Sequence, residues 1–102
     1  MEETLSLQKC AERLERRGFR CFVVPGLKEA AGVMRGLVRE FNPASASYGD
    51  SMTLKATGIL DDLRANPDIQ FYDGFLPDMD REEKWEIRRR GMTADLFLTG
   101  IN

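Results

Sequence analysis

Residues 45–60 read SASYGDSMTLKATGIL, and this stretch decides the fold. The small residues of ASASYG (44–49) predict a short strand, and a helix is expected to begin near Ser51. Gly58 is expected to interrupt that helix, with a second helical segment over about 59–65. A strand, a tight turn and a helix in succession form the repeating unit of an α/β sheet.

Toward the N-terminus the same alternation continues. Leu7, Cys10, Ala11 and Leu14 repeat at helical spacing between residues 4 and 17. The apolar run FRCFVV (19–24) predicts a strand covered on both faces, and residues 27–41 carry an apolar stripe that predicts a helix docked on the sheet.

Toward the C-terminus the pattern repeats twice more. IQFYD (69–73) predicts a third strand, and Asp80 with Glu83 predicts the start of a helix that ends near Gly91. TADLFLTG (93–100) is the fourth predicted strand. The sequence therefore predicts one domain over residues 1–102, a three-layer α/β fold with a mainly parallel sheet of about four strands.

Composition excludes several classes of function. The net charge of −2 and the pI near 5.2 argue against a nucleic-acid partner, and no apolar run is long enough to predict a membrane span. The chain has no histidine, and its two cysteines, Cys10 and Cys21, do not form a metal-binding pair. We therefore expect a cytoplasmic protein without a metal or other cofactor bound within this chain.

The best candidate site is the loop after the strand at 44–49, because ligands of α/β sheets bind beyond the carboxyl ends of strands. Gly49 permits close approach of a ligand to the backbone, and Ser51 or Thr53 can offer a hydroxyl. Spacing alone favours a simpler interpretation, in which these residues only cap a helix. Asp50 would repel an anion, but it can bind a sugar hydroxyl or act as a general base.

The end of the last predicted strand supplies a second wall for this site. If the strands are parallel, Thr99, Gly100 and Asn102 lie on the same rim as Gly49. Within the same strand Asp95 is expected to be paired or to lie at its amino end.

Two groups of residues near the last predicted helix favour structural roles. We interpret Arg88, Arg89 and Arg90 as a solvated helix end that complements the helix dipole. Trp85 and Met92 lie seven residues apart, and that spacing favours a place in the core.

Two segments resemble linked motifs of a known family. YGDSMTLKATGILDDLR (48–64) and EEKWEIRRRGMTADLFLTGIN (82–102) are similar to the patterns G-G-S-x-T-L-x-x-I-G-L and R-R-x-x-x-T-A-D-x-F-L-T-G-x-N of the lactate-utilisation (LUD) domain family. The resemblance covers nearly the whole chain. It implies half of a fold of the ribose-phosphate isomerase and CoA-transferase-like superfamily, which also includes glucosamine-phosphate isomerase. It also implies a ligand-binding role for Gly49, Ser51, Thr53, Thr99, Gly100 and Asn102.

The chain departs from the family pattern in two ways. Asp50 replaces the usual second glycine, and the family continues past Asn102 into a further strand region. We therefore expect a truncated domain, covering the N-terminal half, that leaves one sheet edge exposed and favours a homodimer through that edge.

The resemblance implies a component of L-lactate oxidation to pyruvate, whose iron–sulfur oxidoreductase partners are other subunits. In this short form we expect a domain that binds a small anionic or hydroxylated ligand, or another subunit. A small sugar-phosphate isomerase or acyl/CoA-transfer enzyme, using Asp50 as the base and Ser51 to hold the substrate, is the alternative, and a structural or interaction module is the third interpretation. The sequence leaves open whether the chain is an enzyme.

Overall fold

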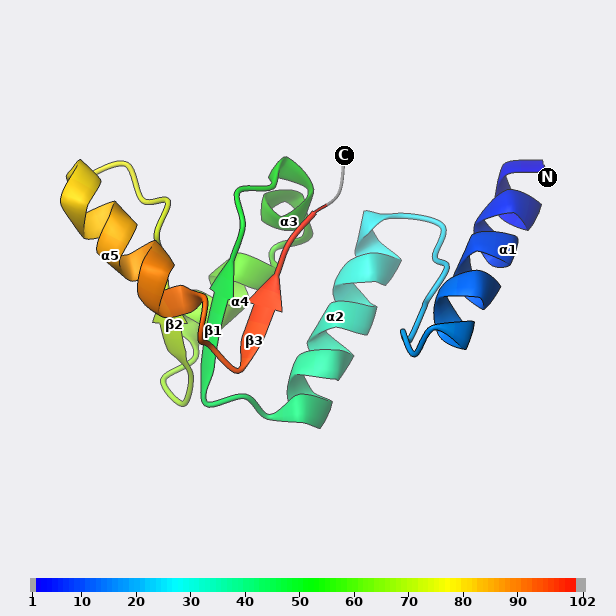
Figure 1. Ribbon diagram of the computed structural model, residues 1–102, viewed down its shortest axis with the longest axis horizontal. Coiled ribbons are helices and arrows are strands. Elements are labelled where there is room, and N and C mark those ends of the chain that lie inside the picture. Colours follow the sequence, from blue (N-terminus) through cyan, green and yellow to red (C-terminus); the bar gives the residue numbers. More distant parts are fainter. Residues whose placement is uncertain (1, 101–102) are drawn as a thin grey trace.

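A computed structural model describes residues 2–100, with side chains from Ser6 onward (Figure 1). In chain order the elements are α1 (Glu2–Arg16), α2 (Leu27–Phe41), β1 (Ser45–Tyr48), α3 (Met52–Thr57), α4 (Ile59–Ala65), β2 (Gln70–Tyr72), α5 (Arg81–Gly91) and β3 (Leu96–Leu98).

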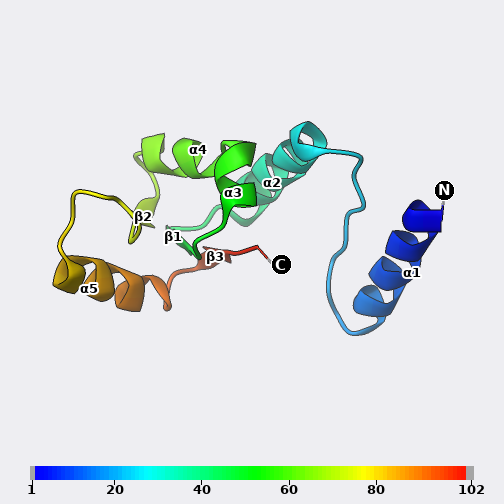
Figure 2. The same cartoon turned by 90° about the horizontal axis from the view of Figure 1, so that it is seen from above.

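The three strands form one parallel sheet in the order β2-β1-β3. Ala46 of β1 lies opposite Phe71 of β2 and Leu96 of β3. Viewed from above, α2, α3 and α4 lie on one side of the sheet and α5 lies on the other (Figure 2). The mixed α/β class, the layers and the parallel direction of the strands are therefore as the sequence predicts.

The order of the strands creates a switch point beside β1. The chain passes from β1 to β2 through α3 and α4 on one face, and from β2 to β3 through α5 on the other face (Figure 2). Consequently the connections that leave the carboxyl ends of the neighbouring strands β1 and β2 go to opposite faces of the sheet. In open α/β sheets such a crevice, at the carboxyl ends of the strands, is where ligands bind.

The core lies between β1 and the pair α3 and α4. Ala46 and Tyr48 point to that face because side chains alternate along a strand. They pack with the buried side chains of the two short helices, namely Leu54, Ile59, Leu60 and Leu63.

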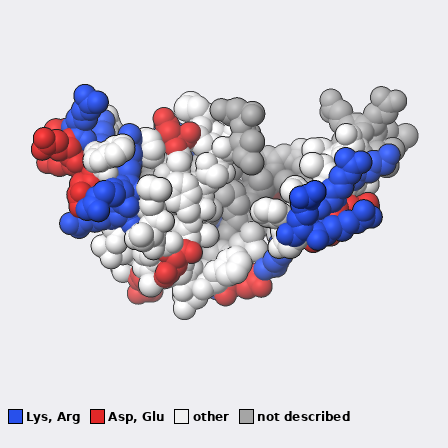
Figure 3. Space-filling view, viewed as in Figure 1, with Lys and Arg blue, Asp and Glu red and all other residues white. Residues whose placement is uncertain are grey.

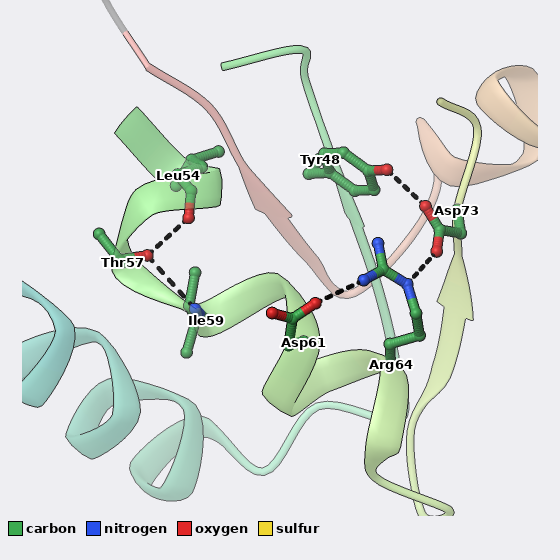
Figure 4. Close-up of polar contacts among 7 residues, drawn as sticks. All are labelled: Tyr48, Leu54, Thr57, Ile59, Asp61, Arg64 and Asp73. Atoms are coloured by element: carbon green, nitrogen blue, oxygen red, sulfur yellow. Dashed lines mark hydrogen bonds and ion pairs between the residues drawn. The ribbon is translucent and has the colours of Figure 1, made fainter. Parts of the chain in front are cut away.

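The predicted break at Gly58 is confirmed. Gly58 has a φ of 79°, in the left-handed region that glycine adopts without strain. Thr57 joins the two helices across it, since its hydroxyl donates to the carbonyl of Leu54 at 2.7 Å and accepts from the amide of Ile59 at 3.3 Å (Figure 4).

The opposite face of β1 is covered by α5. Ser47 points to this face, and a Cβ placed on Gly91 would come within 2.2 Å of the Ser47 hydroxyl oxygen. The absence of a side chain at Gly91 therefore sets how closely α5 approaches the sheet. The start of α5 is also as predicted, because the Asp80 carboxylate accepts a hydrogen bond from the Glu83 amide at 2.8 Å.

The prediction of a strand at 19–24 is wrong. The segment FRCFVV contains no strand residues and joins no strand of the sheet, which has three strands among the described residues rather than four. Its side chains lack the neighbours that would fix a strand, since Phe19 is 60% exposed and Phe22 is 49% exposed. Strand formation depends on pairing and burial more than on composition.

The helix α1 stands away from the sheet in both views (Figures 1 and 2). The Cα radius of gyration is 15.2 Å, whereas a compact chain of this length has one of about 13 Å. The apolar stripe of α1 is accordingly uncovered, with Leu7 and Leu14 both exposed.

Candidate functional site

The loop after β1 and the residues after β3 meet at one rim of the sheet. The Gly49 amide donates to the Leu98 carbonyl at 2.8 Å. A Cβ on Gly49 would lie 3.0 Å from Oγ1 of Thr99, and a Cβ on Gly100 would lie 2.4 Å from Oγ of Ser51. The two predicted segments are thus adjacent, and each glycine faces a hydroxyl of the other segment.

A hollow of about 220 Å³ opens at this rim. It is lined by Asp50, Ser51, Met52, Thr53, Lys55 and Gly100. Drug-sized ligands occupy pockets of about 300–1,000 Å³, so this hollow fits a smaller molecule. Gly49 and Thr99 support its wall without lining it, and the predicted site residue Asn102 lies outside the described residues.

Lys55 gives the rim a cationic group that sequence reasoning missed. Its Nζ lies 3.1 Å from Oδ1 of Asp50, and both side chains are about half exposed to solvent. The hollow therefore contains one carboxylate and one ammonium group side by side. The sequence does contain a signal for this pair, because Lys55 follows the acidic loop residue Asp50 by about one helical turn.

Ser51 is the N-cap of α3. Its hydroxyl oxygen accepts a hydrogen bond from the Leu54 amide at 3.3 Å, as the simpler interpretation of the loop predicts. The cap leaves the hydroxyl hydrogen of Ser51 free to donate toward the hollow. Because α3 has only six residues, we assign the attraction for an anion to Lys55 rather than to a helix dipole.

A second hollow, of about 190 Å³, lies on the α5 face of the sheet, and its walls include Tyr48, Gly49, Phe75, Arg88 and Arg89. Trp85, Met92 and Phe97 also line it. The prediction that Trp85 and Met92 belong to the core is wrong, since they are 69% and 79% exposed. The reason is that α5 covers β1 and β2 and leaves the adjacent face of β3 open (Figure 2).

The three arginines at the end of α5 have two roles. The Arg88 guanidinium donates to the Gly74 carbonyl at 2.9 Å and lies 4.0 Å from the centre of the Phe75 ring, so it holds the loop before α5. Arg89 and Arg90 are exposed and paired with Glu86, as a solvated helix end predicts. Hydrogen bonds from Arg89 and then Arg90 lower the pKa of Glu86.

Asp95 joins two strands at their amino ends. Its carboxylate accepts from the Ala44 amide at 3.0 Å, and its own amide donates to the Ser45 hydroxyl at 3.0 Å. The residue lies directly before β3 and is paired, as expected. These bonds fix the register of β3 against β1 and hence the position of the rim.

A polar network that the sequence did not reveal lies at the carboxyl ends of β1 and β2 (Figure 4). The Tyr48 hydroxyl donates to the Asp73 carboxylate, which also pairs with Arg64, and Arg64 donates to Asp61 at 2.8 Å. Burial, followed by the hydrogen bond to Asp73, raises the pKa of Tyr48 to about 12. The hydrogen bond to Asp73 raises the pKa of Arg64.

This network serves the structure beneath the rim. Tyr48 also stacks on Phe71 with ring centres 5.4 Å apart, so its hydroxyl and its ring both have partners within the fold. Among the side chains described, from Ser6 to Gly100, the structure places no three His, Cys, Asp or Glu side chains close enough to hold a metal ion. The hollow beside Asp50 and Lys55 is therefore the candidate site that we consider for function.

A family model described as the LUD domain matches residues 7–102. No curated protein matches the chain. No solved structure matches it either.

Proposed function

Because this chain belongs to the LUD domain family, which is associated with lactate utilisation proteins, we propose that it is a component of L-lactate utilisation that binds the substrate. Its ligand would occupy the rim hollow between the β1–α3 loop and Gly100. The electrons of lactate oxidation would pass to iron–sulfur oxidoreductase subunits, with which we expect this chain to assemble in the cytoplasm.

One observation carries the proposal, the adjacent Asp50 carboxylate and Lys55 ammonium in a small hollow. A 2-hydroxy acid offers a carboxylate and a hydroxyl on neighbouring carbon atoms. Lys55 can pair with the carboxylate, while Asp50 accepts a hydrogen bond from the hydroxyl. Asp50 therefore acts as a hydroxyl acceptor, and its charge is offset by Lys55, so it does not exclude an anionic ligand.

The volume of the hollow favours a short acid over a larger ligand. A sugar phosphate or CoA would extend beyond about 220 Å³ of space and would place a phosphate of charge near −2 next to Asp50. We therefore expect L-lactate to bind more tightly than either.

Among the helices that the structure describes, none has the length and apolar character needed to cross a membrane.

The test is a thermal-shift and calorimetric titration of the chain with L-lactate, sugar phosphates and CoA. L-Lactate should raise the melting temperature, because a ligand that binds only the folded state stabilises it. Lys55→Gln should abolish the shift and Asp50→Asn should weaken binding by about tenfold, in line with the loss of one charged hydrogen bond.

Lys84→Gln serves as the matched control, because it removes the same charge from α5 and leaves the rim hollow unchanged. It should bind L-lactate as the unaltered chain does. Wild-type binding by Lys55→Gln, or a larger shift with CoA than with lactate, would contradict the proposed site.

A further inference from the structure

The N-terminal arm, which we define as α1 with residues 17–26, exposes apolar surface that nothing in the described structure covers. Leu7 and Leu14 of α1 are 55% and 39% exposed, and Phe19, Phe22 and Val23 are between 43% and 60% exposed. Residues 19–24 are β-branched or aromatic at most positions, and such residues favour a strand when a sheet edge is available.

The sheet offers a matching surface on β3. In the described structure β3 pairs only with β1, so the backbone groups of its outer edge are available for another strand. Phe97 of β3, together with Trp85 and Met92 of α5, forms an exposed apolar patch beside that edge. Lys and Arg side chains gather over α5 and α1 at the two ends of the molecule, and the described surface between them is mostly uncharged with a few Asp and Glu groups (Figure 3).

The arm extends away from its own sheet in both views (Figures 1 and 2). Arg20 pairs with Glu40 at 3.1 Å, which holds the start of the segment near the end of α2. In the described structure the arm is not paired with β3 of its own chain, so both the segment 19–24 and the outer edge of β3 are without a strand partner.

The accessible surface area of the chain is larger than that of a compact monomer. The accessible surface is 7989 Å². A compact monomer of 11.6 kDa exposes only about 5,800 Å². Two chains that each bury the excess of about 2,000 Å² would form an interface of roughly 4,000 Å², within the range of obligate homodimers.

We propose that two copies of this chain exchange their N-terminal arms. Residues 19–24 of one copy add to the outer edge of β3 of the other as a fourth strand, and the apolar stripe of α1 covers the patch formed by Trp85, Met92 and Phe97. The exchange gives residues 19–24 the sheet partner that their composition favours. It also adds a fourth strand to the three that the described residues form.

The experiment measures mass and hydrogen exchange of the full chain across a range of concentrations. Light scattering should give a dimer, and amides of residues 19–24 and of β3 should be protected together. On dilution the mass should fall to that of a monomer, and protection should disappear over the same range of concentration for residues 19–24 and for the β3 amides that point away from β1, while the β3 amides bonded to β1 stay protected.

The double variant Phe19→Glu with Val23→Glu places two charges on one face of the extended segment. In the exchanged dimer these carboxylates would be buried against apolar groups, so the dissociation constant should rise about 100-fold or more. The control is Phe41→Glu with Met52→Glu, which replaces two other exposed apolar residues and adds the same charge. The control should dimerise as the unaltered chain does.

Three results would overturn the proposal. The first is a monomer at every concentration. The second is a dimer that the arm variant leaves unchanged, and the third is protection of residues 19–24 that does not depend on concentration, which would place the arm on its own sheet. The Lys55→Gln variant should still dimerise, so failure of lactate binding and failure of arm exchange are separate outcomes.

Discussion

Gly91 lies where α5 meets β1, and its role can be tested by adding a single methyl group at this position. Gly91→Ala would place a Cβ 2.2 Å from the Ser47 hydroxyl oxygen and 2.7 Å from the Ser47 Cβ. The helix must shift to relieve this overlap, so we expect the free energy of unfolding to fall by about 2 kcal/mol, as overpacking does. Denaturant unfolding measures the change.

Gly32→Ala is the control for this substitution. Beyond its two chain neighbours and the backbone of its own helix, no atom lies within 4 Å of a Cβ placed at Gly32, which is in the interior of α2. Alanine should therefore stabilise the helix by about 0.5–1 kcal/mol. Equal effects of the two substitutions would show that contact with Ser47 does not limit the approach of α5.

The raised pKa of Tyr48 predicts that the free energy of unfolding falls as the pH becomes alkaline. Its pKa of about 12 in the folded chain lies above the ordinary value of 10.0, so the unfolded chain loses this proton first as the pH rises. The stabilisation from neutral Tyr48 is complete below pH 10 and is lost progressively between pH 10 and about 12. Unfolding followed at several pH values should show this loss, and Tyr48→Phe should remove the part that belongs to Tyr48.

Tyr72 allows the ionisation itself to be assigned, because the chain has only two tyrosines. A spectrophotometric titration of the folded protein should show the ionisation near pH 12 in the Tyr72→Phe variant and not in Tyr48→Phe. Persistence of that step in Tyr48→Phe would contradict the assignment.

At the residue scale the sequence predicted positions better than interactions. It placed Gly49, Ser51, Thr99 and Gly100 on one rim because parallel strands end on the same side of a sheet. The pairing of Asp50 with Lys55 was missed because it depends on side-chain direction within one turn of helix, which spacing alone does not specify. The contact of Tyr48 with Asp73 was missed because it joins residues 25 positions apart.

Among the elements, α5 begins at a cap whose contribution can be measured. Asp80→Ala removes the carboxylate that accepts from the Glu83 amide, and we expect a loss of about 1 kcal/mol in the free energy of unfolding. Asp80→Asn should retain most of the stability, because an amide oxygen also caps a helix.

Asp78→Ala is the control for the cap, because it removes an exposed acid from the loop two residues before the cap. Its effect should stay within about 0.5 kcal/mol. If Asp78→Ala and Asp80→Ala destabilise equally, the loss would reflect general loop charge and not the cap.

Elements that form through local signals were predicted well. Helices α2 and α5 and the break between α3 and α4 follow from periodicity, the Asp80 cap and Gly58, all of which act within a few residues. The predicted strand at 19–24 does not form in the described structure, since strand formation depends on a pairing partner that the sequence pattern does not reveal. The positions of Trp85 and Met92 were wrong for a related reason, because burial depends on which strand a helix covers.

For the whole molecule, the separation of arm and body predicts where proteases cut. In dilute solution trypsin should cleave first after Arg16, Arg17 or Arg20, where an exposed and extended backbone joins α1 to α2. The fragment that contains α2 to β3 should persist, and mass spectrometry of the time course identifies it. Arm exchange should slow these first cuts as the protein concentration rises.

Cleavage that begins after Arg64 or within residues 88–90 would contradict this division of the molecule. Those arginines lie in α4 and α5, which pack on the sheet.

The sequence predicted three layers and a parallel sheet because helices and strands alternate, but the strand order β2-β1-β3 and the separate arm came only from the structure.

The position of β3 also has a consequence for how the chain folds. The unit from β1 to β2 closes a short loop, whereas β3 must pair with β1 across about fifty residues, Ala46 with Leu96. Closing the longer loop costs more entropy, so we expect β3 to join last. Gly100 reaches Ser51 only when β3 is in place, and the rim hollow therefore does not exist in a partly folded chain. A ligand that binds there would act as a pharmacological chaperone, because it binds only chains in which β3 has joined the sheet and so shifts the folding equilibrium toward them.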